Sequence, residues 1–171
     1  PALLKSGDTV EVLIEPDDGK SGVYYARGIG VERSNVRIEG LRHEIEGEGD
    51  DGNPYNGFIA VLNAANVVLA DCVFSGHRVY ELGGTSRGSY DISVKTSVGV
   101  TLVGCTQAND IMDTSRWGVF VSNYSKCLTY DRCTLSRFDA HCGVCNATIR
   151  RSTLGYQGIN AIGFGTLLVE D

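Results

Sequence analysis

A short unit of apolar and small residues recurs six times along this chain, and it constrains the fold more than any other feature. The unit has the form apolar-x-apolar-x-x-small, as in Val67-x-Leu69-x-x-Cys72. Its sixth position falls at residues 41, 72, 105, 133, 152 and 171, so the intervals are 31, 33, 28, 19 and 19 residues. A repeat that keeps its register while its loops change length is typical of a solenoid, in which like residues of successive coils stack.

The residue pattern predicts that each coil is built from short strands. The chain has 22 glycines against three prolines and one methionine, and it shows no sustained helical stripe. Alternating apolar runs occur instead, for example at Val10-Val12-Ile14, Ile92-Val94 and Val119-Val121. We therefore predict an all-β fold, a right-handed, single-stranded parallel β-helix of about five to six coils.

The length of 171 residues suits a single domain covering residues 1–171. Polar segments near 43–56, 77–89 and 110–116 interrupt the repeat and are predicted to be loops inserted between coils. The last copy of the repeat stops in mid-turn, and the chain begins with Pro1 instead of methionine. Because solenoids need polar caps, we expect these residues to be part of a longer protein.

The charge pattern narrows the range of partners. A net charge of -6 and a pI near 5.0 leave no basic patch for phosphates, so a nucleic-acid partner is not expected. No apolar run approaches 18 residues, so no membrane insertion is expected. We predict no cofactor; the carboxylates Glu46, Glu48, Asp50 and Asp51 leave calcium as a weak alternative, since their spacing fits no dedicated calcium loop.

Three of the six cysteines, Cys72, Cys105 and Cys133, occupy the same position of the repeat. We expect them to stack as small buried residues about 4.8 Å apart on successive coils. Disulfides remain an alternative, as does a weak metal site in which Cys142-x-x-Cys145 joins Cys133 and His141. No metal site is predicted.

The connections that leave the repeat strands should lie side by side, because successive coils stack in register. They bring together the candidate catalytic residues Asp113, Asp139 and His141. Hydrolysis of a glycosidic bond uses two carboxyl groups, for which Asp113 and Asp139 are the candidates, whereas a lyase needs a base such as His141 and a cation. Candidate substrate-binding residues are Glu81, Asp110, Arg116, Trp117, Arg137 and Tyr156.

The binding candidates have chemistry that suits sugars: a Trp offers a sugar ring an apolar platform, and Arg binds acidic substituents bidentately. Structural roles are equally open for several of these residues. Asp139 would also suit the capping of a turn, His141 a structural hydrogen bond, and Asp110 and Asp113 a solvated loop.

Two segments resemble a known superfamily. The opening SGDTVEVLIEP and the later Asn35-Val36-Arg37-Ile38-Glu39-Gly40 resemble the first coils of pectate-lyase-like β-helices. The stretch LTYDRCTLSRFDAHCGVCNATIRRSTLGYQGIN resembles the central β-helix of bacteriophage tail spikes and pre-neck appendage proteins. The calcium-binding Asp clusters and paired Arg/Lys of pectate lyases are missing from this sequence, so a true pectate lyase is not expected.

The resemblance implies a homotrimeric receptor protein on the virion tail, or otherwise extracellular, that binds bacterial surface polysaccharide or teichoic acid and often depolymerises it. Two alternatives stay open. One is a non-catalytic glycan-binding or structural spike, and the other is a secreted bacterial polysaccharide lyase or epimerase. A β-helix by itself does not establish a reaction.

Overall fold

A computed structural model describes residues 29–43, 58–78, 80–82, 85–87 and 90–171, with the side chains of residues 77–89 left out of the description. The predicted strand at Val10–Ile14, the acidic part of the 43–56 segment and the side chain of Glu81 lie outside the described residues. The described part of the chain contains no helix long and apolar enough to span a membrane.

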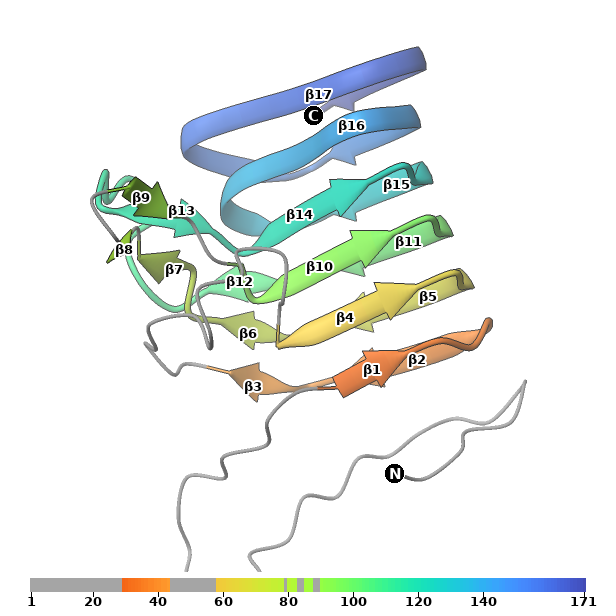
Figure 1. The fold of residues 1–171 in the computed structure, drawn as a ribbon, viewed down its shortest axis with the longest axis horizontal. Coiled ribbons are helices and arrows are strands. Elements are labelled where there is room, and N and C mark those ends of the chain that lie inside the picture. The colour runs from red at the N-terminus through yellow and green to blue at the C-terminus, as the bar shows by residue number, and fades with distance from the viewer. Residues whose placement is uncertain (1–28, 44–57, 79, 83–84, 88–89) are drawn as a thin grey trace, which may run out of the picture.

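The described strands form three parallel stacks that wrap around one core (Figure 1). The first stack contains β1 (Ile29–Val31), β4 (Ile59–Leu62), β10 (Ile92–Lys95) and β14 (Phe120–Asn123). The second contains β2 (Val36–Glu39), β5 (Ala65–Ala70), β11 (Val98–Val103) and β15 (Lys126–Asp131). The third contains β3 (Arg42–His43), β6 (Val73–Phe74) and β12 (Thr106–Gln107).

Two long strands, β16 (Thr134–Arg150) and β17 (Thr153–Glu170), bend around the core and add to every stack. The first stack therefore rises through β1, β4, β10, β14, β16 and β17. This arrangement confirms the predicted all-β parallel β-helix of five to six coils. The parallel register also explains the sequence repeat, since each coil places its apolar residues above those of the coil before.

The segment predicted as an inserted loop near 77–89 contributes short strands outside the stacks. β7 (His77–Arg78) pairs antiparallel with β13 (Arg116–Gly118), and β8 (Tyr80–Leu82) pairs antiparallel with β9 (Thr85–Arg87). Figure 1 shows these strands at the side of the coils. The insertion thus reaches the strand that carries Trp117.

The core consists of ladders of like residues. Val67, Val100, Leu128 and Ala147 follow one another through the second stack, and each is at most 4% exposed. Full burial of a Val or Leu side chain contributes about 1.5–3 kcal/mol. A second kind of ladder is aromatic: Phe120, Tyr130 and Phe138 lie with ring centroids 4.9–5.9 Å apart.

The predicted cysteine stack is confirmed. Cys72, Cys105 and Cys133 are all buried, and their thiols donate to the carbonyls of Ala70, Leu69 and Leu102 at 3.1, 3.3 and 3.3 Å. All six cysteines are free, which excludes the disulfide alternative in this structure. The buried thiols therefore act as small apolar residues that also satisfy backbone acceptors.

The corners between stacks repeat a left-handed backbone conformation. Asn35, Asn66, Gly99, Cys127 and Asn146 occupy one such corner, with φ values of 61, 56, 69, 54 and 59°. Asn and Gly tolerate this conformation better than other residues do. The corner is stabilised further because the Asn66 side chain donates a hydrogen bond of 3.1 Å to Asn35 Oδ1 on the preceding coil. The stacked corners keep the coils in register.

Candidate functional site

The candidate site lies on the outer surface of the first stack, on β16. Phe138 and Ala140 of this strand are fully buried in the core. Because successive side chains of a strand point to opposite faces, the alternate residues Arg137, Asp139 and His141 point outward. The local alternation of the sequence thus places a cation, a carboxylate and an imidazole side by side.

Asp139 is the centre of a hydrogen-bond cluster and is fully buried. Its Oδ2 accepts from Tyr90 Oη at 2.6 Å and from Arg137 Nη2 at 2.8 Å. Its Oδ1 contacts His141 Nδ1 at 2.6 Å and accepts from Asn160 Nδ2 at 3.0 Å. A buried carboxylate is tolerated only when charges and donors compensate the lost hydration, and this cluster supplies both.

His141 is the member of the cluster that reaches solvent, with 20% of its side chain exposed. Its Nδ1 faces Asp139, and a carboxylate accepts a hydrogen bond from the protonated ring nitrogen. This contact fixes the neutral tautomer in which Nε2 carries the lone pair. In this tautomer, Nε2 is a hydrogen-bond acceptor.

Trp117 and Tyr90 cover the other side of the cluster. Trp117 Nε1 donates to Tyr90 Oη, and the two rings meet edge-on with centroids 6.4 Å apart. Burial, together with the charge of Asp139, raises the pKa of Tyr90 far above its ordinary value. The phenol therefore remains protonated and serves as a donor to Asp139.

Arg137 is held between Asp139 and Trp117. Its guanidinium carbon lies 4.9 Å from the centroid of the Trp117 ring, a cation–π contact. Its Nε and Nη1 are buried and have no hydrogen-bond partner among the described residues. Trp117 thus has one ring face occupied by Arg137, which leaves at most its other face for a ligand.

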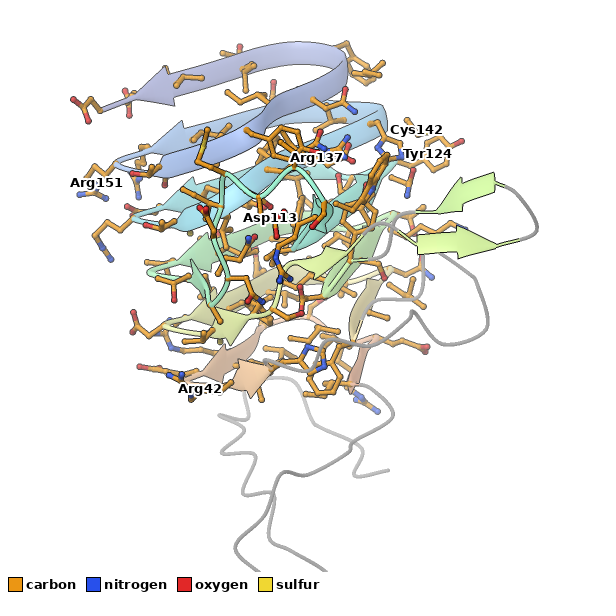
Figure 2. The ribbon with its side chains drawn as sticks, turned by 90° about the vertical axis from the view of Figure 1, so that its left-hand side faces the viewer. Arg42, Asp113, Tyr124, Arg137, Cys142 and Arg151 are labelled. Atoms are coloured by element: carbon orange, nitrogen blue, oxygen red, sulfur yellow. The ribbon has the colours of Figure 1, made fainter. Side chains whose placement is uncertain are left out.

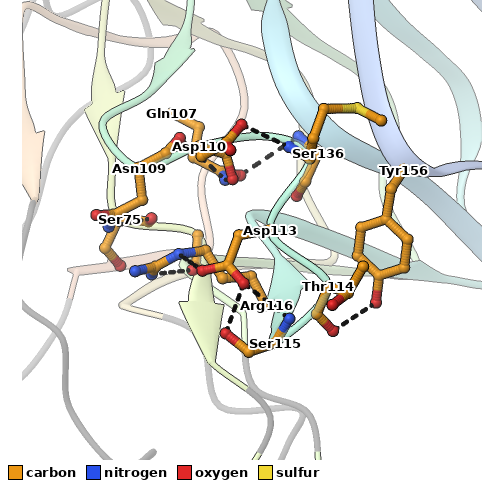
Figure 3. Close-up of polar contacts among 12 residues, drawn as sticks. Ser75, Gln107, Asn109, Asp110, Asp113, Thr114, Ser115, Arg116, Ser136 and Tyr156 are labelled. Carbon is orange, nitrogen blue, oxygen red and sulfur yellow. Dashed lines mark hydrogen bonds and ion pairs between the residues drawn. The ribbon is translucent and has the colours of Figure 1, made fainter.

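A second group of predicted residues lies on the segment between β12 and β13 (Figure 3). Asp113 Oδ1 accepts from the backbone N–H and the hydroxyl of Ser115 at 2.9 and 2.7 Å. Asp113 Oδ2 accepts from Arg116 Nε at 3.1 Å, and Arg116 Nη1 donates to the Gly76 carbonyl at 2.9 Å. Asp113 therefore forms an Asx turn that is anchored by a buried arginine.

The same segment is tied to the top coil. Tyr156 Oη donates to the Thr114 carbonyl at 3.0 Å, and the Tyr156 backbone N–H donates to the Ile111 carbonyl at 3.2 Å. Asp110 Oδ1 accepts from the backbone N–H of Met112 at 2.9 Å. Figure 2 shows the Asp113 segment in front of the coils, with Arg137 higher on the stack.

The structure thus divides the predicted site into two groups. Asp139, His141, Arg137 and Trp117 are brought together. Asp110, Asp113, Arg116 and Tyr156 form the loop group. Here the contacts favour the loop alternative for Asp110 and Asp113, because both carboxylates accept hydrogen bonds from the loop itself.

Sequence reasoning missed Tyr90 and Asn160. Asn160 could have been found from the repeat, because it pairs with Asp139 in register on the next coil. Tyr90 could not, because it reaches Asp139 across an intervening coil.

A second buried imidazole–carboxylate pair exists lower on the solenoid. Asp91 Oδ1 contacts His43 Nδ1 at 2.9 Å and accepts from Ser75 Oγ at 3.0 Å. His43 stacks on Phe58 with centroids 3.8 Å apart, and only 9% of its side chain is exposed. Because its imidazole is stacked and buried, this pair serves as a structural connection between coils.

Among the described residues, no group of three or more His, Cys, Asp or Glu side chains is placed to hold a metal ion. The alternative metal site, in which Cys142-x-x-Cys145 joins Cys133 and His141, is not formed among these residues, since Cys133 lies in the core while Cys142 is exposed. The carboxylates considered for calcium lie in the segment outside the described residues.

No protein-family model and no curated protein sequence matches this chain. Among solved structures, it is similar to a protein from Parabacteroides merdae ATCC 43184 described as "a putative glycosyl hydrolase". The TM-score is 0.55 at 13% sequence identity, over 82% of this chain and 75% of that chain. At this identity the similarity shows the fold. The strand pairing described above makes this chain a parallel β-helix protein.

Proposed function

We propose that this chain binds a bacterial cell-surface polysaccharide or teichoic acid along the outer surface of its first stack and depolymerises it, with His141 as the general base. The observation that carries the proposal is the Asp139–His141 pair, in which a buried carboxylate orients a partly exposed imidazole. Trp117 beside it is half-buried and can offer its other ring face to a sugar ring, whereas Arg137 is buried against Asp139 and Trp117. The description of the Parabacteroides merdae neighbour supports a glycan as substrate.

The contacts favour chemistry with one base over hydrolysis by two carboxyl groups. Both oxygens of Asp139 and both oxygens of Asp113 already accept hydrogen bonds, so neither carboxylate is poised as a nucleophile or a proton donor. On a polysaccharide that contains uronate, a base at His141 can instead remove the proton beside the carboxylate. The electron pair of that C–H bond forms a C=C bond, the glycosidic C–O bond breaks, and the departing oxygen takes a proton from water. General base catalysis of this kind contributes about 10²–10⁴-fold.

A non-catalytic glycan-binding spike is the second candidate. It is favoured by the same saturation of Asp113 and Asp139 with hydrogen-bond donors. On the resemblance to phage proteins alone, we further propose that either function operates within a homotrimeric, virion-mounted spike.

The proposal is tested by incubating the chain with a panel of bacterial polysaccharides and teichoic acids and measuring shortened products. We expect cleavage that His141→Gln reduces at least about 100-fold, because the general base is lost. Unsaturated product ends would indicate elimination, and their absence would indicate hydrolysis.

His43→Gln is the matched control, since it removes the other imidazole–carboxylate pair and should leave cleavage intact in the folded protein. Binding without cleavage by the native chain would overturn the catalytic proposal in favour of the spike. Equal loss in both His variants, with both folded, would also contradict it.

A further inference from the structure

The cluster around Asp139 contains a chain of hydrogen bonds with a defined direction. An indole N–H can only donate, and an ionised carboxylate can only accept. Because Trp117 Nε1 donates to Tyr90 Oη, the hydroxyl proton of Tyr90 must point at Asp139 Oδ2, which lies 2.6 Å away. Asp139 then faces His141 with its other oxygen. Hydrogen bonds thus run from Trp117 through Tyr90 to Asp139, and His141 donates to the same carboxylate; we call these four linked residues the relay.

We propose that Tyr90 is a positioning residue for His141, with Trp117 as the anchor that holds the Tyr90 hydroxyl in place. Tyr90 fixes the rotation of the Asp139 carboxylate, and the carboxylate fixes the tautomer and the ring orientation of His141. This inference rests on the proposed role of His141 as the base. It also gives Trp117 a role within the protein, in addition to that of a sugar platform.

The geometry makes this role specific to Tyr90. Tyr90 precedes β10, whereas Asp139 lies on β16, two coils further along. In the register, Val121 of β14, an apolar residue, lies between Asp139 and Ser93 of β10, three residues after Tyr90. Only a long side chain from the lower coil can span this interval, and Tyr90 does so while remaining 3% exposed.

The other groups that bind the Asp139 carboxylate explain why a further hydrogen bond is needed to fix its rotation. Arg137 binds Oδ2 at 2.8 Å and would draw the carboxylate toward itself. Asn160 and His141 bind Oδ1. With Tyr90 removed, Oδ2 keeps Arg137 as its remaining donor in the cluster, so the carboxylate can shift toward Arg137 and its contact with His141 Nδ1 weakens.

The test compares Tyr90→Phe, Trp117→Phe and the native chain by ¹⁵N NMR of the histidine ring nitrogens. We expect the native His141 to show one neutral tautomer, protonated at Nδ1, and Tyr90→Phe to show a mixture of both. Trp117→Phe keeps an aromatic ring beside Arg137 but loses the indole donor, so it should shift the tautomers in the same direction by a smaller amount. Tyr124→Phe, which loses the hydroxyl of a residue 60% exposed, is the matched control.

Where cleavage is measurable, we expect kcat of Tyr90→Phe to fall about tenfold with KM unchanged, as for the loss of one hydrogen bond. Unchanged tautomers in both Tyr90→Phe and Trp117→Phe would overturn the inference, even if the chain cleaves glycan. If the native chain cleaves nothing, the proposed function fails, yet the tautomer measurement still decides whether the relay exists. If Tyr90→Phe does not fold, the tautomers of His141 in Trp117→Phe alone test the inference, and unchanged tautomers in that variant overturn it.

Discussion

Asp131 shows how one carboxylate organises a corner of the solenoid. It lies at the end of β15, where Arg150 Nη2 reaches Oδ2 at 2.9 Å and Arg151 Nη2 reaches Oδ1 at 2.6 Å. Burial opposes the ionisation of Asp131, but hydrogen bonds from Arg151 and Arg150 outweigh it and hold the pKa of this carboxyl below its ordinary value. Both arginines come from the next coil, so the ion pairs join neighbouring coils.

This arrangement predicts a pH-dependent contribution to stability. A carboxyl whose pKa is lower in the folded than in the unfolded state stabilises the protein above its unfolded value of about 4, and the stabilisation is lost as the pH falls through the folded value. We expect Asp131→Asn to lower the melting temperature at pH 7 and to change it progressively less below about pH 4. Asp71→Asn, at the corresponding corner of a lower coil, should show a much smaller effect.

Thermal unfolding between pH 3 and pH 7 measures both variants. The arginines are about half exposed, so added salt should reduce the difference at pH 7. A constant difference between the Asp131→Asn and native proteins over the whole pH range would contradict the role given to this carboxyl.

At the scale of the element, the stack of Cys72, Cys105 and Cys133 predicts two classes of thiol. Hydrogen bonding with the neighbouring thiols of Cys133 and Cys72, together with burial, raises the pKa of Cys105. The same hydrogen bonding lowers the pKa of Cys72 and Cys133, but all three stacked thiols are buried and out of reach of a reagent in solution. Cys127 and Cys142 are exposed, and Cys145 is intermediate.

We therefore expect a thiol-specific reagent to modify Cys127 and Cys142 first and Cys145 more slowly in the native protein. The three stacked cysteines should react only after unfolding. Mass spectrometry of peptides after timed labelling measures the order, and a denatured sample is the control in which all six should react. Native labelling of Cys105 at the rate of Cys142 would show that the core opens readily.

At the scale of the whole molecule, the fold could be predicted because the same pattern of apolar and small residues recurs in successive coils. The spacing of Val67, Leu69 and Cys72 recurs in register, so the repeat alone indicates stacked strands and the buried thiols. The site was only partly predictable. Alternation along β16 brings Arg137, Asp139 and His141 together, but the contact between Tyr90 and Asp139 depends on a side chain that crosses a coil.

The division of the predicted carboxylates has a similar cause. Stacked connections predicted that Asp113 and Asp139 would share one face, but the backbone path within an insertion is not set by the repeat. Local hydrogen bonds decide it instead: the Ser115 hydroxyl and N–H draw Asp113 into a turn, and Arg116 anchors that turn at Gly76. The pairing of Asp113 with Asp139 for hydrolysis stays a prediction.

The top coil lies at one end of the described stacks, because β17 pairs only with β16 among the described strands. Ile159, Leu167 and Val169 continue the core ladders of Phe138, Ala147 and Ile149, yet they are 41%, 45% and 57% exposed. In a solenoid, each coil is stabilised by its neighbours, so a coil covered on one side contributes less. Apolar residues in this row should therefore matter less to stability than their equivalents inside.

We expect Leu167→Ala to cost less than about 1 kcal/mol in the free energy of unfolding, whereas Leu128→Ala, at 1% exposure, should cost about 2–5 kcal/mol. Chemical denaturation of dilute protein measures both, and sedimentation velocity establishes the oligomeric state under the same conditions. Equal costs for the two variants would mean that the row on β17 is covered in solution. If the equality appears only at high protein concentration, the cover is another copy of this chain, an observation that would favour the proposed oligomeric spike over a monomeric enzyme.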